Sequence, residues 1–403
     1  MTGLDGFNYI PKVSGPPHSV IPAHPSLSVS RMLCYAPRMA RQDRSRAVSA
    51  AARTNLLALD EPALEQFVKD LGWPKFRARQ MLRWLYQERI HDIERMTDLS
   101  KAERARLSTL AAIDRIVDCE VRRSSDGTRK FLLRLEDGLV IESVLIPDAD
   151  RLTLCLSTQV GCTLDCGFCL TGQMGLKRNL AAHEIIEQAL AVLDSLGPGE
   201  RLTNVVLMGM GEPLANFEAV ADAVTRLTNT RWGFGIPARR ITLSTAGLAS
   251  RLREVAGLGV NLAVSLNATT DAQRNRLMPA VNRLHPLNRL LAACRAYPLP
   301  PHRRLTFEYV LLAGENDSEQ DAKRLTRLLN GIRCKVNLIP FNPFPGSPYR
   351  RPADNDVLRF QSVLRKAGFD ALIRKSKGRD VLGACGQLGE LVSPHRIVRD
   401  GSC

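Results

Sequence analysis

The chain has 403 residues, 44% of them hydrophobic, so it can bury a core large enough for one large domain and a smaller one. Its formal net charge of +15 favours a polyanionic partner such as nucleic acid, with a basic enzyme that lacks such a partner as the alternative. The sequence has neither an apolar run of about eighteen residues nor a secretory apolar segment, which excludes a membrane span and predicts a cytoplasmic protein.

Residues 1–54 are predicted to form a disordered basic extension. A proline-rich stretch over residues 11–25 precedes an arginine-, serine- and alanine-rich stretch with almost no acidic residue. This composition resembles that of a targeting peptide. A true start of translation at Met32 or Met39 is the alternative explanation.

A small helical domain is predicted over residues 55–117, where apolar residues recur at helical spacing. Its segment 72–79 interleaves basic and aromatic residues, a pattern that suits binding to an RNA backbone. The aromatic residues of this region, Trp73, Phe76 and Trp84, are of types that more often belong to the core than stack on bases. Residues 118–150 then predict a β-hairpin linker, because two alternating segments are separated by Asp137 and Gly138.

From residue 151 to residue 392 the pattern changes to short apolar strands, most of them followed by a helix. Strands are predicted at 152–157, 204–208, 240–244, 261–266, 305–312 and 335–339. The helices with the clearest pattern cover 183–196, 217–227, 318–329 and 355–367. Six units predict an α/β fold with a partial TIM-like barrel, and residues 393–403 form a tail.

Three cysteines within residues 162–169 are the strongest motif. Cys162, Cys166 and Cys169 have the spacing Cys-x-x-x-Cys-x-x-Cys, and three thiolates leave one coordination position of a metal site open. This arrangement favours a catalytic iron–sulfur cluster. A zinc site completed by His183 and an electron-transfer cluster closed by a distant cysteine are the alternatives.

Glycine-rich and polar segments follow several predicted strands. Because the loops after parallel barrel strands form one rim, these segments predict a single pocket that faces the cysteines. They are residues 209–213, 244–247, 265–267 and 342–346.

Taken together, these motifs resemble a known family. The three-cysteine spacing, the sequence Gly-Glu-Pro at 211–213 and the sequence Gly-Ala-Cys-Gly-Gln-Leu at 383–388 are similar to the RlmN family of RNA methyltransferases in the radical S-adenosylmethionine superfamily. The resemblance covers roughly residues 56–392.

The resemblance implies the cofactors and their ligands. In this family three cysteines hold a 4Fe-4S cluster whose open iron binds S-adenosylmethionine, which reduction cleaves to a 5′-deoxyadenosyl radical. The implied S-adenosylmethionine contacts are Gly211, Glu212, Ser244, Ser265, Leu266, Asn267 and Asn342. Many family members carry histidine where this chain has Asn267, which puts that one contact in doubt.

The resemblance also implies three catalytic side chains. Cys385 matches the thiol that carries the methyl group, and Cys155 matches the thiol that releases the product through a transient disulfide bond with Cys385. Glu142 matches the proton acceptor, with an ordinary strand carboxylate as the alternative. Four basic residues before Cys385 are expected to bind RNA phosphates, or to form a solvated charged run: Arg374, Lys375, Lys377 and Arg379.

The activity that follows from the resemblance is methylation of C2 of an adenine in 23S rRNA and in certain tRNAs. The expected partners are these RNAs and an electron donor such as flavodoxin, and the expected state is a monomer. Two alternatives stay open: a Cfr-type enzyme that methylates C8 of adenine, and a non-catalytic RNA-binding protein with structural zinc.

Overall fold

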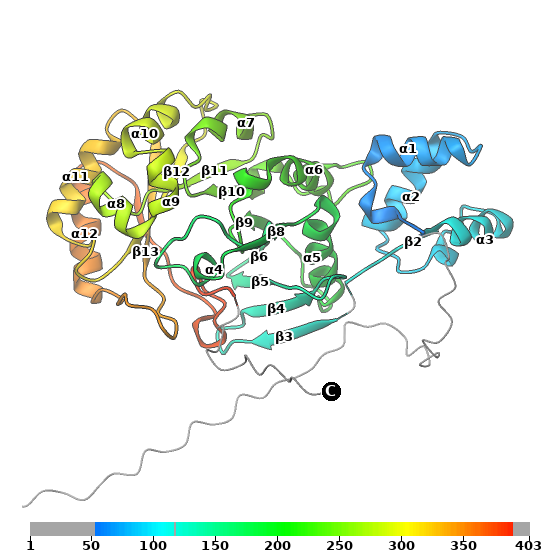
Figure 1. Cartoon of the computed structure of the whole chain (residues 1–403), viewed down its shortest axis with the longest axis horizontal. Helices are drawn as coiled ribbons and strands as arrows, with labels where there is room; N and C mark the ends of the chain where they lie inside the picture. The colour runs from blue at the N-terminus through cyan, green and yellow to red at the C-terminus, as the bar shows by residue number, and fades with distance from the viewer. Residues whose placement is uncertain (1–52, 117, 390–403) are drawn as a thin grey trace, which may run out of the picture.

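The structure, a computed structural model, describes residues 53–116 and 118–389. Apart from residues 53 and 54, the predicted extension and the predicted tail lie outside the described residues. A small helical part stands beside a larger α/β part (Figure 1). In the described part of the chain, no helix is both long and apolar enough to cross a membrane.

The helical part is built from three α-helices, α1 (Glu61–Asp70), α2 (Phe76–Tyr86) and α3 (Lys101–Leu110). Side-chain caps start two of them: Asp60 accepts from Ala63 N at 2.8 Å, and Ser100 and Glu103 form a capping box. Two short strands, β1 (Thr54–Asn55) and β2 (Ala111–Ala112), pair in parallel where the chain enters and leaves. The 3-10 helices η1 (Leu56–Ala58) and η2 (Ile93–Arg95) complete this part.

The α/β part contains a ten-stranded open sheet in the order β14-β13-β12-β11-β10-β9-β6-β5-β4-β3. The seven strands from β14 to β6 are parallel, and β6 to β3 are antiparallel. Their bounds are β3 (Cys119–Arg123), β4 (Arg129–Arg134), β5 (Val140–Asp148), β6 (Arg151–Cys155), β9 (Asn204–Leu207), β10 (Ile241–Thr245), β11 (Asn261–Ser265), β12 (Leu305–Leu311), β13 (Cys334–Pro340) and β14 (Ala371–Ile373).

Helices cover the outer face of the parallel strands (Figure 1). They are α5 (Ala182–Asp194), α6 (Phe217–Thr228), α7 (Leu252–Ala256), α8 (Asp271–Leu277), α9 (Pro279–Leu284), α10 (Leu287–Arg295), α11 (Glu319–Leu329) and α12 (Asp354–Lys366). Short 3-10 helices η3 (Pro213–Asn216), η4 (Ala238–Arg240), η5 (Ala249–Arg251) and η6 (Arg379–Val381) fill the connections. The predicted partial barrel is confirmed, and all six predicted strands are present.

The predicted hairpin is present as β4 and β5, but it is more than a linker. Together with β3 it extends the barrel sheet by three antiparallel strands, because β5 pairs with β6. The sequence pattern did not predict β14 or the small sheet of β7 (Gln159–Gly161) and β8 (Leu176–Asn179), which brackets the cysteine loop and α4 (Leu170–Gln173). These elements are too short to show a periodic pattern.

One buried arginine fixes the helical part to the barrel. Arg226 on α6 is almost completely buried, and its guanidinium donates to Leu57 O at 2.6 Å and to the Tyr86 hydroxyl at 2.7 Å. Asp222, one turn earlier on the same helix, neutralises it at 2.6 Å. This guanidinium therefore links the two parts through neutral acceptors of the helical part.

The segment after β14 returns along the antiparallel strands and brings residues 378–389 beside the cysteine loop (Figure 1). Polar contacts hold it at both ends. Near its start, Ser124 Oγ donates to Asp380 at 2.5 Å and Gly378 N donates to Asp126 at 2.9 Å. Near its end, Gly389 N donates to Glu142 at 2.9 Å. We call residues 378–389 the carrier segment, because it contains Cys385.

Candidate functional site

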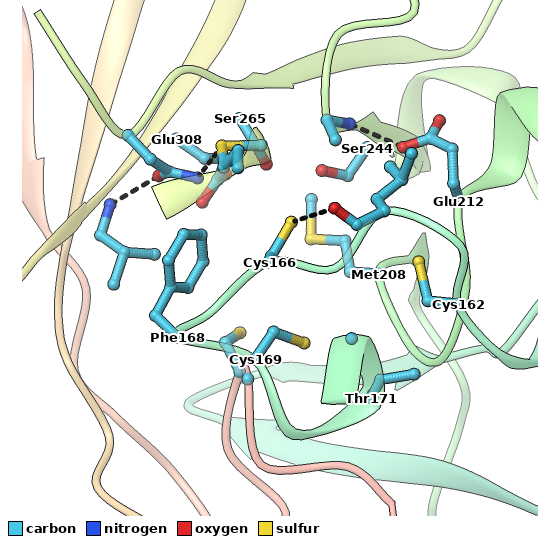
Figure 2. Close-up of a pocket in the computed structure, with 18 of the residues that line it drawn as sticks. Cys162, Cys166, Phe168, Cys169, Thr171, Met208, Glu212, Ser244, Ser265 and Glu308 are labelled. Atoms are coloured by element: carbon cyan, nitrogen blue, oxygen red, sulfur yellow. Dashed lines mark hydrogen bonds between the residues drawn. The ribbon is translucent and has the colours of Figure 1, made fainter. Parts of the chain in front are cut away.

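A cavity with about 1000 Å³ of empty space, part of it open to solvent, lies at the carboxyl ends of the parallel strands. Residues from the loops after several strands and from the carrier segment line it, and Figure 2 shows several of them facing one another. Those that the sequence pointed to are Cys162, Cys166, Cys169, Gly211, Glu212, Ser244, Ser265, Asn267, Asn342, Arg374 and Cys385. The predicted rim of loops therefore meets around one space.

The cysteine loop runs from the end of β7 to the start of α4. At its first end, Gly161 has φ of 80°, and a Cβ there would come within 1.8 Å of Gly175 O, so this position requires glycine. At its other end, Cys169 N donates to Cys166 O at 3.0 Å. In the middle, Gly167 N donates to Leu277 O of α8 at 3.1 Å. These contacts hold the three thiols along one wall of the cavity (Figure 2).

The three thiols resist ionisation in the protein alone. Burial raises the pKa of each of them, that of Cys162 to about 12 and that of Cys166 well above its usual value. Nearby thiolates raise the pKa of Cys166 further. Thiolates gathered in this way need a cationic metal as counter-charge, which would hold them deprotonated. The donor set therefore fits an iron–sulfur cluster.

The zinc alternative requires a fourth ligand beside the three cysteines. Among residues 53–116 and 118–389, no group of three or more His, Cys, Asp or Glu side chains is placed to hold a metal ion. The three cysteines all line the cavity. His183, the fourth ligand of the zinc alternative, is not among the residues that line the cavity.

Glu212 is fixed by backbone groups at the edge of the cavity. Ala246 N donates to its Oε2 at 2.7 Å and Leu214 N donates to its Oε1 at 3.0 Å (Figure 2 draws the first). Burial raises the pKa of this carboxyl group. The Thr245 side chain also hydrogen-bonds this carboxyl group, and because Glu212 lines the cavity, its carboxylate suits a cationic amino group.

Asn342 supplies a buried acceptor that no described residue satisfies. Its Oδ1 atom has no hydrogen-bond partner, while its Nδ2 atom donates to Cys385 O at 3.1 Å. A buried oxygen of this kind normally pairs with a ligand or water. Because the residue lines the cavity, the free oxygen fits a donor group of a bound cofactor.

Two other predicted cofactor contacts are placed differently. The Asn267 amide lines the cavity but is engaged inside the protein, because it accepts from Val310 N at 2.9 Å and donates to the sulfur of Met278 at 3.4 Å. Leu266 is completely buried and does not line the cavity. Its backbone oxygen accepts from Arg274 instead.

The carrier segment brings Cys385 to the cysteine loop. Leu170 N donates to Gly386 O at 2.8 Å, and Thr171 Oγ1 donates to Leu388 O at 2.6 Å. Cys385 is exposed and lines the cavity. A residue more than two hundred positions away in the sequence is thus held beside the first turn after Cys169.

Cys155 ends strand β6 and is buried behind the cavity. Burial and the charge of nearby Cys385 raise the pKa of its thiol to about 12, while the charge of Arg374 lowers it. Both cysteines are free thiols, so the predicted disulfide bond is not present. The structure is that of the reduced pair.

Glu142 does not line the cavity. Its carboxylate lies 2.8 Å from Lys130 Nζ and accepts from Gly389 N at 2.9 Å, and both charged side chains are almost completely buried. Lys130 also donates to Leu382 O at 3.2 Å. The pair therefore fastens the carrier segment to strands β4 and β5.

The sequence did not identify two cavity residues, Glu308 and Met208, that lie next to Arg374. Glu308 on β12 accepts from Asn337 Nδ2 at 2.9 Å and lies 3.9 Å from Arg374 Nη1, which is 3.8 Å from Met208 Sδ. Arg374 was predicted to bind phosphate, but it faces the cavity. The charges of Cys385 and Glu308 raise its pKa. A signal existed, since Glu308 interrupts an otherwise apolar strand.

The chain is similar to known proteins over most of its length. Residues 54–113 match the family described as ribosomal RNA large subunit methyltransferase N-terminal domain, and residues 156–326 match the radical SAM superfamily. The chain is 48% identical over 337 residues to the dual-specificity RNA methyltransferase RlmN of Syntrophus aciditrophicus, covering 83% of this chain and 96% of that protein. It is 50% identical to the RlmN of Alkalilimnicola ehrlichii, covering 83% and 93%.

A solved structure is similar as well. A radical SAM methyltransferase from Sphaerobacter thermophilus superposes with a TM-score of 0.77 at 44% identity, covering 83% of this chain and 99% of that one. The two matched domains cover the helical part, the cysteine loop and the barrel as far as α11. The chain therefore belongs to the RlmN family of radical S-adenosylmethionine methyltransferases.

Proposed function

We propose that this protein methylates C2 of an adenine in 23S rRNA and in tRNA. The relatives that share about half of its residues are dual-specificity RNA methyltransferases. The observation that carries the proposal is the junction of the carrier segment with the cysteine loop, where Leu170 N donates to Gly386 O at 2.8 Å. This junction puts a thiol that could carry a methyl group beside the three that would hold a cluster.

Cys162, Cys166 and Cys169 would hold the 4Fe-4S cluster, and Glu212 and Asn342 would bind S-adenosylmethionine. Glu212 offers a fixed carboxylate to the amino group, and Asn342 offers its free oxygen to a donor. Gly211, Ser244 and Ser265 border the same space. When bound, these groups supply a methyl group and a carbon-centred radical.

Two further thiols of the protein would carry the methyl group and release the product. Cys385 is exposed in the cavity, so its sulfur can accept the methyl group and later reach the adenine. Cys155, at the end of β6, is the thiol that would attack the Cys385 sulfur and free the product. Adenine C2 is electron-poor, so a carbon radical carried on sulfur reaches it where polar methyl transfer does not.

Glu142 is proposed as the group that removes the proton from C2. Its support is position, since the carboxylate accepts from Gly389 N, four residues after Cys385. The Lys130 ammonium group lies 2.8 Å from the carboxylate and fixes its orientation. Movement of the carrier segment during the reaction would expose the Glu142 carboxylate to the adenine ring.

The RNA contacts would come from both parts of the molecule. In the helical part, Phe76 is exposed and the guanidinium of Arg77 lies 5.4 Å from its ring centre, which suits base stacking. Lys75, Arg77 and Arg79, in contrast, are paired with Glu65, Glu103 and Glu61. Lys375, just before the carrier segment, and Arg379, within it, are exposed and suit phosphate contacts.

The proposal includes a cytoplasmic monomer that receives electrons from a small donor protein such as flavodoxin. A one-electron donor is needed because cleavage of S-adenosylmethionine to a radical consumes one electron. Anaerobic gel filtration and electron transfer from reduced flavodoxin to the reconstituted protein test the two statements separately.

The direct test incubates the anaerobically reconstituted protein with S-adenosylmethionine, a reductant and unmodified RNA, followed by mass spectrometry of the nucleosides. Formation of 2-methyladenosine in a 23S rRNA fragment and in tRNA supports the proposal. Formation of 8-methyladenosine would favour the Cfr-type alternative. Absence of the broad iron–sulfur absorption band after reconstitution would favour the zinc-binding alternative.

A further inference from the structure

Two arginine side chains of the barrel are among the largest completely buried groups of the described chain, and they differ in one respect. Arg226 has a carboxylate partner, Asp222, at 2.6 Å. Arg274 on α8 has no ion-pair partner within the described residues, and its guanidinium donates only to neutral oxygens. These are Leu266 O at 3.3 Å, Asn282 Oδ1 at 3.1 Å, His285 O at 2.9 Å and Ala246 O at 2.7 Å.

A buried cation without a neighbouring anion is costly, and the carbonyl groups around it offset only part of the desolvation. Burial lowers the pKa of Arg274 only to about 10, so the group stays charged at neutral pH. Asp271, one turn earlier on α8, raises the pKa of Arg274 through its charge. Its carboxylate, however, accepts a hydrogen bond from Leu287 N at 2.9 Å and forms no ion pair with Arg274. The structure therefore leaves a positive charge that an additional anion would stabilise.

The position of Arg274 indicates where that anion binds. Arg274 lies one layer behind the cavity wall, because it donates to Ala246 O while Ala246 N donates to Glu212. Its helix also contacts the cysteine loop, since Gly167 N donates to Leu277 O. Packing is tight here: a Cβ on Gly247 would lie 3.1 Å from Arg274 Nη2.

The electrostatic coupling agrees with the packing. Among the charged groups around Arg274, Cys166 has the largest favourable electrostatic effect on the guanidinium. A 4Fe-4S cluster with three thiolates is anionic and gains one more negative charge on reduction. A fixed cation behind Cys166 stabilises the reduced form more than the oxidised form.

We propose that Arg274 is a positioning residue whose buried, unpaired charge raises the reduction potential of the cluster held by Cys162, Cys166 and Cys169. This inference rests on the proposed function, because it requires that these cysteines hold a cluster. The electron comes from the external reductant, and no bond forms or breaks at Arg274. The same guanidinium fixes the carbonyl groups of Leu266 and Ala246, so its charge and its hydrogen bonds must be tested separately.

Four variants make that separation. Asn282→Asp keeps the arginine and gives its Nη1 atom a carboxylate partner, but it loses the Asn282 Nδ2 donor to Asp271 O and Asn275 Oδ1. Asn282→Ala loses the same donor without adding a charge, so it is the control. Arg274→Met removes the charge, and Arg274→Lys keeps it. The holoprotein of each is reconstituted, its iron and sulfide contents are measured, and the cluster is titrated potentiometrically by electron paramagnetic resonance without S-adenosylmethionine.

At a fixed applied potential near neutral pH, Asn282→Asp and Arg274→Met should lower the ratio of reduced to oxidised cluster roughly tenfold. A tenfold change corresponds to about 59 mV for a one-electron couple. Arg274→Lys and Asn282→Ala should stay near the wild-type ratio. Should Arg274→Met fail to fold, the comparison of the two Asn282 variants still decides the question.

The inference is overturned if Asn282→Asp carries a full cluster with the wild-type potential. It is also overturned if Arg274→Lys shifts the potential as far as Arg274→Met, since geometry rather than charge would then be responsible. Neither result would affect the methyltransferase proposal. A wild-type protein that assembles no cluster would overturn both.

Discussion

Lys130 Nζ lies 2.8 Å from a carboxylate oxygen of Glu142, and both side chains are almost completely buried beneath the carrier segment. The pair joins the antiparallel strands to Leu382 O and Gly389 N on either side of Cys385. Glu142 thus has two possible contributions, to stability and to catalysis, and they can be separated.

Glu142→Gln should lower the free energy of unfolding by about 3–5 kcal/mol, because it leaves the Lys130 ammonium group buried without its counter-ion. It should also abolish turnover. The double variant Lys130→Met, Glu142→Gln removes the unpaired charge and should recover much of the stability, measured by urea denaturation, but none of the turnover. Recovery of turnover in the double variant would show that Glu142 is only structural.

Cys385→Ala and Cys155→Ala should fail at different steps. Without Cys385 no methyl group reaches the protein, so mass spectrometry should find no methylated cysteine and no RNA adduct. Without Cys155 the product is not released, so an RNA–protein adduct should accumulate on a denaturing gel. Cys155 is buried, and its replacement should cost only about 1 kcal/mol of stability. An adduct in Cys385→Ala would contradict the assignment.

Asn342→Leu should weaken S-adenosylmethionine binding about tenfold, because the pocket loses its free acceptor. Asn342→Asp keeps that acceptor and loses the donor to Cys385 O, so binding should change less while methyl transfer slows. Equilibrium dialysis of the reconstituted protein measures the first effect and single-turnover kinetics the second. Equal affinities of the leucine variant and the wild type would disprove the contact.

The sequence predicted six of the seven parallel strands because they are buried apolar runs, most of them followed by a helix, whereas β14 is only three residues long. It also identified most of the cavity, since the polar residues follow these strands at one edge. Periodicity could not show where the carrier segment lies, because residues 378–389 form only the short helix η6 and are placed by long-range hydrogen bonds such as Thr171 to Leu388.

The sequence also could not predict which charged residues form buried ion pairs or face the cavity. Arg374 stands in a run of basic residues, and only the fold shows that it faces the cavity while Lys375 faces solvent. Lys130 follows Arg129 at the start of β4, where two adjacent charged residues suggest a solvated strand end. It is buried because the carrier segment covers it, a contact between positions about 250 residues apart.

Glu187 on α5 predicts a pH dependence of stability. Burial raises the pKa of its carboxyl group to about 8, so the folded protein keeps a proton that the unfolded chain releases near its ordinary value of 4.5. The free energy of unfolding should therefore fall as the pH rises from about 4.5 to about 8 and level off above that. Glu187→Gln can still accept from Ile116 N.

The Glu187→Gln variant should thus lose this dependence and be more stable than the wild type above pH 8. Thermal denaturation across pH 5–9 checks the effect, with Glu218→Gln, an exposed position, as the control. A parallel decline in Glu187→Gln and the wild type would show that another group is responsible.

Neutralising Lys375, Lys377 and Arg379 together should weaken RNA binding in proportion to the number of phosphate groups that these three side chains bind. Each bound phosphate contributes about 0.7–0.9 to the slope of log affinity against log salt, so the slope should fall by roughly 2. Filter binding over a range of salt concentrations measures it. Cluster content should stay unchanged, because Arg374, which faces the cavity, is kept. An unchanged salt slope would assign phosphate binding to another surface.

The most direct test of the central claim is mass spectrometry of nucleosides from separately purified 23S rRNA and tRNA of a strain that lacks this gene. We expect 2-methyladenosine to disappear from both RNA pools, to return when the wild-type gene is restored, and to stay absent when Cys385→Ala is supplied. Unchanged 2-methyladenosine in both pools of the deletion strain would contradict the assignment of this protein as the adenine C2 methyltransferase.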